Sequence, residues 1–261
     1  MPDFRIISWN VNGLRAVHKK GFLDWLAKDK PDILCIQETK CLEDQVPEEV
    51  KDGVGYHTFF ASGETKGYGG VGLFTKEKPL SVKFSLDIDG FDDDGRDIVA
   101  DYGRFILFNV YFPNGKASKE RLQYKLKFYD LFLELIDGLK AEGRKIVICG
   151  DVNTAHKEID LARPRQNEKI SGFLPVERAW MDKLVAHGFL DTFRIFNQQG
   201  NNYSWWDLKT KARERNVGWR IDYFFVSDNM REQIKSAFIL TSVTGSDHCP
   251  VGIEVVDALP W

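Results

Sequence analysis

Apolar residues along this chain fall into short runs that are separated by polar segments and by a few longer amphipathic stretches. The longer stretches have helical spacing and predict helices at residues 14–28, 118–142 and 175–187, the second with Ser118 as its N-cap. The short runs predict β-strands, at residues 4–9, 32–37, 56–61, 71–75, 80–85, 97–102, 104–111, 145–150, 203–206, 222–226, 235–241 and 251–256. Many strands with few long helices predict an α/β sandwich of two stacked mixed sheets flanked by helices.

Polar side chains follow several of these strands at the point where the apolar run stops. The run from Lys145 to Cys149 is followed by Gly150, Asp151, Val152 and Asn153. A strand that is buried on both faces is a continuous apolar run, and groups at its end are free to act in a cleft. Other strands end at Asn10 and Asn12, at Glu38, and at Tyr111, and Asp247 and His248 precede the last one. Such a set suits one cleft that holds a hard metal ion and a phosphate.

Composition limits where a polyanion could bind. The 261 residues include 43% hydrophobic and 29% charged residues, which is ordinary for a globular protein that buries a full core, and we expect a single domain over residues 1–261. The formal net charge is −3, so the chain as a whole carries no basic signal for nucleic acid. A nucleic-acid site would therefore need a local cationic patch together with a metal.

Cysteine usage and hydropathy predict the compartment. Cys35, Cys41, Cys149 and Cys249 lack the spacing of a zinc site and are expected to be free, buried thiols in a reducing compartment. The start of the chain has no signal-like apolar region, and no apolar stretch approaches the roughly 20 residues of a membrane span. We expect a cytoplasmic monomer with no membrane contact.

The carboxylates and amides at the strand ends favour metal binding through oxygen. Taken alone, Glu38 either binds a cation or caps the next segment, but Asp151 and Asp247 at other strand ends favour the cation. Mg²⁺ prefers one or two carboxylates together with water and substrate phosphate, and no Cys or His cluster competes. The candidate ligands are Asn10, Asn12, Glu38, Asp151, Asn153 and Asp247.

Two pairs of residues and one tyrosine have both a structural and a catalytic interpretation. Asp222 enters an apolar strand and needs a partner, and pairing with His248 would fix the imidazole tautomer and raise its basicity. A lone His is otherwise more often structural. Asp151 and Asn153 share a face if the chain is extended, but Gly-Asp-x-Asn is also good turn chemistry. The Tyr111 phenol either donates to a phosphate oxygen or packs at the end of a sheet.

Seven segments, taken together, resemble the exonuclease III family of abasic-site (AP) endonucleases across essentially the whole chain. The Gly-Asp-x-Asn and Ser-Asp-His pieces are shared with DNase I-like nucleases, inositol polyphosphate phosphatases and sphingomyelinases. The segments that begin at Ser8 and at Asn216 are the ones that point to DNA repair. The segments are Ser8-Trp-Asn-Val-Asn-Gly-Leu-Arg-Ala16, Ile36-Gln-Glu-Thr-Lys40, Gly67-Tyr-Gly-Gly-Val71, Tyr111-Phe-Pro-Asn114, Gly150-Asp-Val-Asn-Thr-Ala-His156, Asn216-Val-Gly-Trp-Arg-Ile-Asp-Tyr223 and Gly245-Ser-Asp-His-Cys-Pro250.

The resemblance implies a four-layer α/β sandwich and Mg²⁺-dependent hydrolysis of the phosphodiester 5′ to an abasic site, with Mn²⁺ as an alternative ion. By matched position, Glu38 and Asp247 bind the metal, with Asn12 close by. Family members often carry Asp where this chain has Asn12, so a second metal position is weaker or absent. Asp151 would align or deprotonate the attacking water, and Asn153 would orient it. Tyr111, Asn10 and His248 would hold the phosphate, with Asp222 supporting His248; the general base is either Asp151 or the His248–Asp222 pair.

The resemblance also implies how damaged double-stranded DNA is held. Trp205, Trp219 and Ile221 match the pocket for a flipped-out sugar, although core packing is the ordinary role of a Trp. The cation-rich stretches 116–127 and 209–220 are further candidates for phosphate contacts. Positions that match DNA-facing loops are Arg15, Lys20, Tyr68, Arg96, Asn114 and Asn167.

Two other classes of function compete with a repair endonuclease. A phosphatase or phospholipase of the same fold would act on inositol or lipid phosphates, but the Trp-bearing C-terminal segment and the lack of a membrane-binding stretch oppose it. A DNA-binding module with a dead site is opposed by the competent residue at every candidate catalytic position. The sequence does not rank AP-endonuclease activity against 3′→5′ exonuclease, 3′-phosphatase or uracil-directed nicking.

Overall fold

Two six-stranded sheets form the centre of the fold in the computed structural model, which describes residues 4–63, 67–88, 90–91 and 94–256. The first sheet has the order β13 (Ile234–Ile239), β14 (Val251–Val255), β1 (Phe4–Asn10), β2 (Ile33–Gln37), β4 (Val71–Thr75) and β3 (His57–Ala61). The second sheet has the order β5 (Ser81–Lys83), β6 (Asp97–Asp101), β7 (Ile106–Val110), β8 (Ile146–Asp151), β12 (Asp222–Ser227) and β9 (Phe189–Asp191). A separate two-stranded ribbon consists of β10 (Trp205–Trp206) and β11 (Gly218–Trp219).

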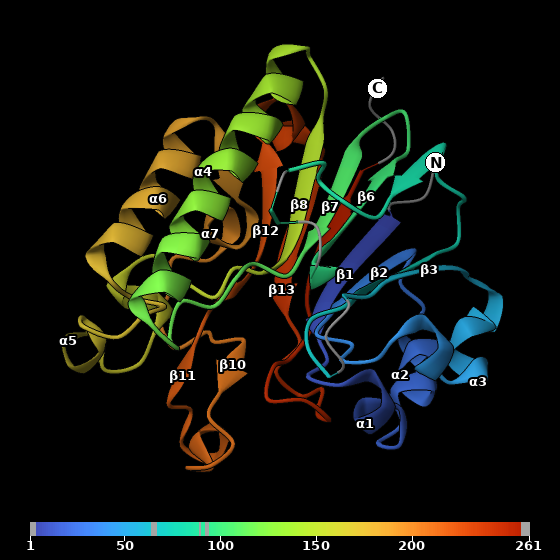
Figure 1. The fold of residues 1–261 in the computed structure, drawn as a ribbon, viewed down its shortest axis with the longest axis horizontal. Coiled ribbons are helices and arrows are strands. Elements are labelled where there is room, and N and C mark those ends of the chain that lie inside the picture. The colour runs from blue at the N-terminus through green and yellow to red at the C-terminus, as the bar shows by residue number, and fades with distance from the viewer. Residues whose placement is uncertain (1–3, 64–66, 89, 92–93, 257–261) are drawn as a thin grey trace.

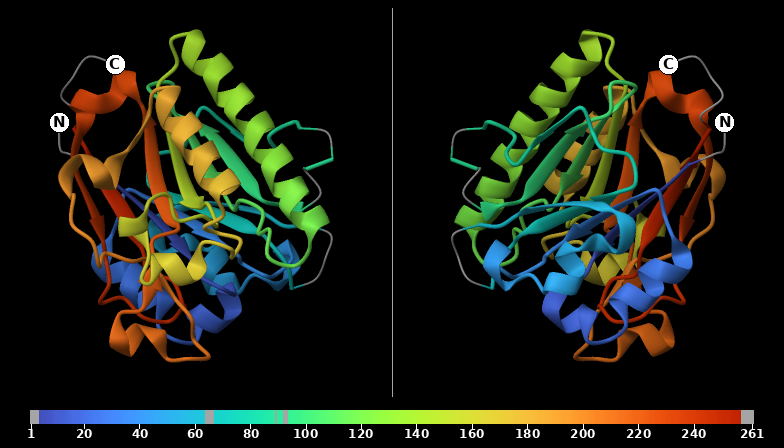
Figure 2. Two further views of the ribbon diagram at one scale, coloured as in Figure 1. Left: turned by 90° about the vertical axis from the view of Figure 1, so that its left-hand side faces the viewer. Right: turned by 90° about the vertical axis from the view of Figure 1, so that its right-hand side faces the viewer.

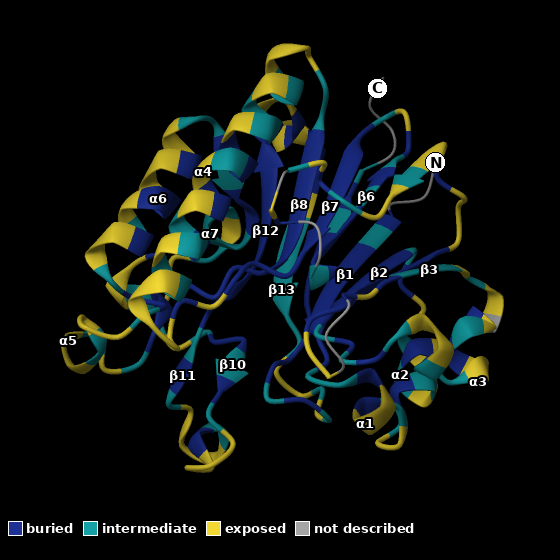
Figure 3. Ribbon diagram, in the orientation of Figure 1, coloured by how far each residue is buried: buried dark blue, intermediate teal, exposed yellow. Residues whose placement is uncertain are grey.

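Helices cover the outer faces of the two stacked sheets, so the fold is the predicted four-layer α/β sandwich (Figures 1 and 2). The first sheet is flanked by α1 (Leu14–His18), α2 (Phe22–Asp29) and α3 (Glu48–Lys51), and the second by α4 (Lys119–Ala141) and α6 (Pro175–Ala186). The shorter helices are α5 (Pro164–Asn167) and α7 (Thr192–Phe196). Buried residues follow the strands, and exposed residues follow the outer helix surfaces (Figure 3).

Strand alternation divides the apolar side chains between three cores. In β1, Ile6 faces the layer between the sheets, whereas Ile7 faces the helices. In β8, Cys149 faces the same inter-sheet layer, whereas Ile148 faces α4 and α6. Because side chains on a strand alternate between its two faces, Asp151 at the end of β8 has the same direction as Cys149 and points toward the first sheet.

Each sheet contains one parallel pair of neighbouring strands, and these pairs set the position of the polar strand ends. β1 and β2 run parallel, as do β7 and β8, while the other pairs are antiparallel. The connection from β1 to β2 contains α1 and α2, and that from β7 to β8 contains α4. In open α/β sheets, ligands bind outside the carboxyl ends of parallel strands. Asn10, Gln37, Val110 and Asp151 mark those ends here.

The main departure from the predicted elements lies near the N-terminus. The prediction of one helix over 14–28 is wrong, because α1 ends at His18 and α2 starts at Phe22. Gly21 has φ 91° and caps α2, so the chain turns between two helices that otherwise share one apolar face. Within the described ranges, no helix is both long enough and apolar enough to cross a bilayer.

Candidate active site

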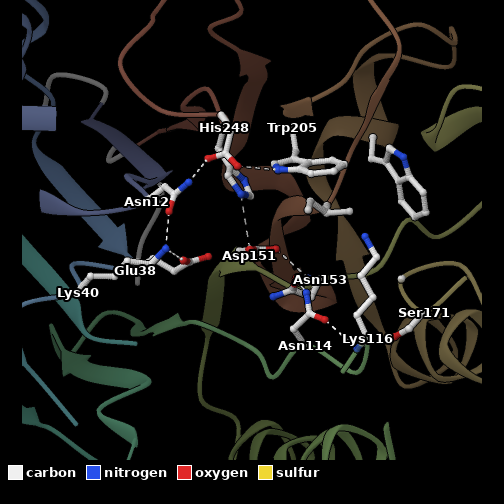
Figure 4. A pocket seen from close by; sticks show the side chains of 14 residues that line it. Asn12, Glu38, Lys40, Asn114, Lys116, Asp151, Asn153, Ser171, Trp205 and His248 are labelled. Atoms are coloured by element: carbon white, nitrogen blue, oxygen red, sulfur yellow. Dashed lines mark hydrogen bonds and ion pairs between the residues drawn. The ribbon is translucent and has the colours of Figure 1, made fainter. Parts of the chain in front are cut away.

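A cavity of about 270 Å³ lies where the ends of the two sheets meet, and Figure 4 shows the side chains that line it. Strand ends of the first sheet supply one wall, β8 supplies the floor, and the β10–β11 ribbon supplies an aromatic wall. The lining residues are Asn12, Glu38, Lys40, Asn114, Lys116, Asp151, Asn153, Ser171, Gly172, Trp205, Trp219, Ile221, Asp247 and His248. The sequence thus predicted ten of them as site residues and placed Lys116 in a cation-rich stretch that could contact phosphate, whereas Lys40, Ser171 and Gly172 had no assigned role.

Asn10 joins the two sheets at the base of the cavity. Its side chain is fully buried, and its amide nitrogen donates to Glu38 Oε1 at 2.8 Å and to Asp151 Oδ2 at 2.9 Å. Glu38, Asp151 and His248 each present one ligand atom, and these atoms lie within 4.8 Å of one another. The described residues therefore contain a compact group that can hold a metal ion, and its two carboxylates suit a hard cation.

Glu38 stays charged in this group. Burial alone would raise the pKa of the Glu38 carboxyl, but the charge of Lys40 and hydrogen bonds from Asn10 and Lys40 lower that pKa below its usual value. The Lys40 Nζ lies 2.7 Å from Glu38 Oε2 and also donates to Asn12 Oδ1. A negatively charged oxygen is thus kept available beside Asp151.

Asp247 lies near this group but is held by other donors. Its Oδ1 accepts from the Asn12 amide at 2.7 Å, and its Oδ2 accepts from the Trp205 indole at 3.0 Å. Burial opposes its charge, but the positive charge of His248 and these hydrogen bonds lower the pKa of Asp247. Asp247 is therefore linked to Glu38 through Asn12 and Lys40, and it is not a member of the compact group.

His248 makes the contact with Asp222 that the sequence led us to infer. Its Nδ1 lies 2.9 Å from Asp222 Oδ2, and its Nε2 lies 3.9 Å from Asp151 Oδ2. Burial works against the charged ring, but Asp222, Asp151 and Asp247 together raise the pKa of His248 to about 10. At neutral pH the ring is therefore an imidazolium whose Nε2 faces the cavity side of Asp151.

The pKa of Asp151 is also raised, but here the main cause is burial, which disfavours the charged carboxylate. Burial raises the pKa of its carboxyl to about 8, with Asp222 and Glu38 adding to the rise and His248 opposing it. Its Oδ1 accepts from the backbone N–H of Asn153 at 2.8 Å. A carboxyl whose pKa lies near neutrality can take up and release a proton during a reaction.

The neighbouring amide, Asn153, is fixed by two partners and by a buried ion pair beneath it. Its Oδ1 accepts from Asn114 at 2.8 Å, and its Nδ2 donates to a backbone carbonyl at 3.0 Å. Lys125, which is fully buried, donates to the Asn153 carbonyl oxygen at 2.8 Å and to Glu177 at 2.7 Å. Glu177 in turn accepts from the backbone N–H of Gly172 at 2.6 Å, so one ion pair fastens two walls of the cavity.

Backbone strain is concentrated in the same place. Asn12, Glu38, Lys40 and Asn153 have φ values of 46°, 52°, 53° and 56°. Non-glycine residues adopt this left-handed region at a cost of roughly 1 kcal/mol or more, and such residues cluster at functional sites. At Glu38 the left-handed turn follows the end of β2 and breaks the strand alternation.

The aromatic wall consists of the three residues predicted to receive a sugar. Trp205 and Trp219 meet edge to face, with ring centroids 6.3 Å apart, and Ile221 packs beside them. Lys116 places its Nζ 5.9 Å from the centroid of the Trp205 ring. Both indoles are only partly buried, unlike Trp9 and Trp206 in the cores.

Tyr111 and Arg96 lie behind the cavity lining. Burial, with the charges of Glu38 and Asp151, raises the pKa of Tyr111 well above its usual value, so its phenol keeps its proton. The Arg96 guanidinium is 1% exposed, stacks over the Tyr111 ring at 5.4 Å, and bonds to Asp94 and to the Tyr68 hydroxyl. Asp94 therefore serves as the partner of Arg96, and Arg96 in turn packs against Tyr111.

The remaining predicted DNA contacts lie outside the cavity. Arg15 lines a neighbouring hollow of about 400 Å³ with Lys19 and Lys40. Lys20 donates to the Gly245 carbonyl at 2.8 Å, and Asn167, at the end of α5, donates to backbone carbonyls of its own segment. In the stretch 209–220, Arg220 is buried and bound to Asp160 and Asp191, so it is unavailable to phosphate.

Comparison with known proteins defines the class to which this fold and site belong. The model of the endonuclease/exonuclease/phosphatase family matches residues 7–248, and the chain belongs to this family. It is 41% identical to an exodeoxyribonuclease of Bacillus subtilis over 96% of this chain and 99% of that protein.

Two solved structures show which members of this family the chain resembles in its fold. An AP endonuclease from Archaeoglobus fulgidus has a TM-score of 0.88 at 31% identity, covering 98% of this chain and all of that one. A 3′ phosphatase from Neisseria, solved with a product DNA hairpin, has a TM-score of 0.89 at 29% identity, covering 99% of this chain and all of that one. The predicted membership of the exonuclease III-type AP endonucleases is confirmed, and the chain is a DNA repair nuclease.

Proposed function

We propose that this protein hydrolyses the phosphodiester on the 5′ side of an abasic site in double-stranded DNA, leaving a 3′-hydroxyl and a 5′-deoxyribose phosphate. The observation that carries the proposal is one cavity in which Glu38, Asp151 and His248 meet at its base and Trp205 and Trp219 form a wall. The first part suits a phosphate, and the second suits a sugar that has no base.

Glu38 and Asp151 would hold Mg²⁺, with Asp247 and Asn12 next in reach. Both carboxylates fit a hard cation, and the lowered pKa of Glu38 keeps one of them charged. The bound ion would supply positive charge that stabilises the oxygens of the reacting phosphate. Asn12 offers an amide where family members often carry Asp, so we propose a single strong metal position.

The protein's own groups divide the remaining work between a base and several donors. The ionised fraction of Asp151 accepts a proton from the attacking water. Its pKa of about 8 lies close enough to neutrality for that fraction to be present and strongly basic, whereas His248, with a pKa of about 10, is almost wholly protonated. The His248 imidazolium donates a hydrogen bond to a phosphate oxygen. Tyr111, predicted for the same role, keeps its phenolic proton but lies behind the cavity lining. Water supplies the hydroxyl that bonds to phosphorus, and the departing 3′ oxygen gains a proton. Phosphoryl transfer of this kind depends mainly on positioning and on charge stabilisation.

Selectivity for an abasic site follows from the aromatic wall. Extruding a nucleotide costs least where no base pairs or stacks, and the two partly buried indoles offer apolar surface to the sugar. Undamaged DNA would be held through phosphate contacts alone. Lys116, beside the Trp205 ring, is placed to meet a phosphate at the rim.

The decisive experiment uses four end-labelled duplexes that carry an abasic analogue, a 3′-phosphate, a uracil or no lesion. Each is incubated with Mg²⁺ and with EDTA, and inositol polyphosphate is tested in parallel. We expect incision 5′ to the abasic analogue that EDTA abolishes. Hydrolysis of inositol phosphate without incision of any duplex would overturn the proposal in favour of a phosphatase of the same fold.

The same assay ranks the companion activities: 3′→5′ exonuclease, 3′-phosphatase and uracil-directed nicking. All of them cleave a phosphate ester next to a sugar, so this cavity could serve each. The expectation of a cytoplasmic location is supported by the four cysteines, which are buried and unpaired as in proteins of reducing compartments. Sedimentation velocity would test the separate expectation that the enzyme is a monomer.

A further inference from the structure

Lys40 stands between the active-site cavity and the hollow beside it, and it lines both. Its ammonium lies 2.7 Å from Glu38 Oε2 and donates to Asn12 Oδ1, and Figure 4 shows it pointing between these two side chains. Its left-handed backbone, with φ 53°, turns the side chain back toward Glu38. The amide of the same Asn12 then reaches Asp247 at 2.7 Å.

Both carboxylate oxygens of Glu38 already accept from a donor. Oε1 accepts from Asn10, which is fully buried and simultaneously bound to Asp151. Oε2 is in contact with Lys40, whose side chain is 34% exposed and adjoins open space of about 400 Å³. Of the two donors to Glu38, only Lys40 at Oε2 adjoins open space into which it could move, and a cation that binds at Oε2 meets its like charge.

We propose that Lys40 is a built-in competitor for the divalent cation at Glu38, and that cation binding moves its ammonium into the hollow lined by Arg15 and Lys19. The inference rests on the proposed function, because it takes Glu38 as a metal ligand. Once displaced, the ammonium joins two other cations on a surface that can meet the DNA backbone. Metal binding and DNA binding then strengthen each other, since coupling between two sites is reciprocal.

Direct metal titration tests the competition without measuring activity. We would titrate the DNA-free protein with Mn²⁺ and follow the signal of free Mn²⁺ by electron paramagnetic resonance, and repeat the titration with Mg²⁺ by calorimetry. Lys40→Met removes the charge and keeps the length of the side chain. Removing a like charge at contact distance should tighten Mn²⁺ binding on the order of tenfold, and less at high salt.

Two matched variants separate charge at this position from other effects. Lys40→Arg keeps the charge and should bind Mn²⁺ about as weakly as the unaltered protein. Lys19→Met removes a charge from the same hollow without touching Glu38 and should change affinity less than about twofold. Unchanged or weaker binding by Lys40→Met would overturn the proposal, and so would Lys40→Arg binding as tightly as Lys40→Met, or an equal gain in Lys19→Met.

Glu38→Gln distinguishes a failure of this inference from a failure of the proposed function. If Glu38→Gln binds Mn²⁺ as well as the unaltered protein, Glu38 is not a ligand and the metal assignment falls. If Glu38→Gln loses binding while Lys40→Met fails to gain it, only the competitor role falls. Thermal melting of each variant confirms that the titrated protein is folded.

Discussion

At the scale of single residues, the site gives different pKa values to two ionisable groups, Asp151 and His248, that lie 3.9 Å apart. Burial raises the pKa of Asp151 to about 8, and three carboxylates raise that of His248 to about 10. Pairs of titratable groups whose surroundings set their protonation apart are typical of acid–base catalysis. In the mechanism that we propose, this pairing gives Asp151 the role of proton acceptor and His248 the role of charged donor.

Replacing Asp151 with Asn should separate chemistry from binding. DNA affinity measured in EDTA, without the metal that Asp151 would help to hold, should be kept or improved, because a negative charge near the phosphate is removed. Turnover should fall by about 10²–10⁴-fold, the usual contribution of proton transfer to a positioned group. Single-turnover kinetics and a fluorescence anisotropy titration would measure the two effects. A parallel fall of both would make Asp151 a structural residue.

Replacing Trp219 with Ala should weaken lesion recognition more than stability. Trp219 is only partly buried and faces the cavity, so its loss should cost about 1–2 kcal/mol of unfolding free energy, against about 3–5 for a core Trp. The ratio of abasic to undamaged affinity should fall, while binding to undamaged duplex should stay nearly constant. Trp180, 5% exposed and stacked on Tyr129 at 3.9 Å, provides the core control. A large drop in melting temperature with an unchanged ratio would return Trp219 to the core.

Motif residues at the strand ends could be predicted because apolar runs and the polar residues after them are local features. The Asp222–His248 contact could be inferred from chemistry, since a buried acid needs a partner. Lys40 and Ser171 could not be assigned, because nothing local distinguishes a lysine that folds back on a carboxylate from a solvated one. The position of Lys40 depends on a left-handed turn. The position of Ser171 depends on the buried Lys125–Glu177 ion pair, in which Lys125 lies far away in the chain.

At the scale of elements, the segment that carries Trp219 and Asp222 is anchored by a buried ion-pair network. Arg220 bonds to Asp160 at 2.8 Å and to Asp191 at 2.6 Å, and Arg194 also reaches Asp160. Burial alone would raise the pKa of Asp160, but the two arginines lower it below its usual value. The start of β12 is thereby tied to the 158–160 turn.

Asp160→Asn should destabilise the fold by about 3 kcal/mol at pH 7, because breaking a buried pair leaves charge uncompensated. A carboxyl with a lowered folded pKa contributes stability above its unfolded pKa and loses it as pH falls through the folded value. The difference between the two proteins should therefore be constant from pH 7 to about 5 and shrink below about pH 4. Urea unfolding at pH 7, 5, 3 and 2 would measure it, and a constant difference down to pH 2 would contradict the role of charge.

Long, periodic elements could be predicted closely, whereas several short ones could not. The predicted helices 118–142 and 175–187 correspond to Lys119–Ala141 and Pro175–Ala186. β9, β11 and α7 were not predicted, because two to five residues carry no recognisable period. Strand β11 forms by pairing with β10, and Trp205 lies opposite Trp219 in this pair. The local propensity of either segment does not encode such a pairing.

At the scale of the whole molecule, the site depends on both sheets at once. Glu38 follows the first sheet, Asp151 ends the second, and one buried amide links them. The inter-sheet core draws its side chains from both sheets. Neither sheet can therefore bury its inner face alone, which supports a single domain over residues 1–261.

A single domain should unfold in one cooperative step. Calorimetry should show one transition whose van't Hoff and calorimetric enthalpies agree, and tryptophan fluorescence should give the same midpoint as far-ultraviolet circular dichroism. The six Trp in the described part of the chain report on both helical layers, on the ribbon and on the cavity. Two separated transitions, or midpoints that differ between the probes, would contradict the single domain.

The inter-sheet layer also sets the spacing between the halves of the catalytic apparatus. Side chains such as Ile6 and Cys149 fill that layer directly behind the polar strand ends. Protein interiors are close-packed and transmit small displacements, and a misplacement of about 1 Å can cost about a hundredfold in rate. Apolar positions that touch neither DNA nor metal thus act as spacers for the chemistry, and a methyl group lost there should slow the reaction as well as destabilise the protein.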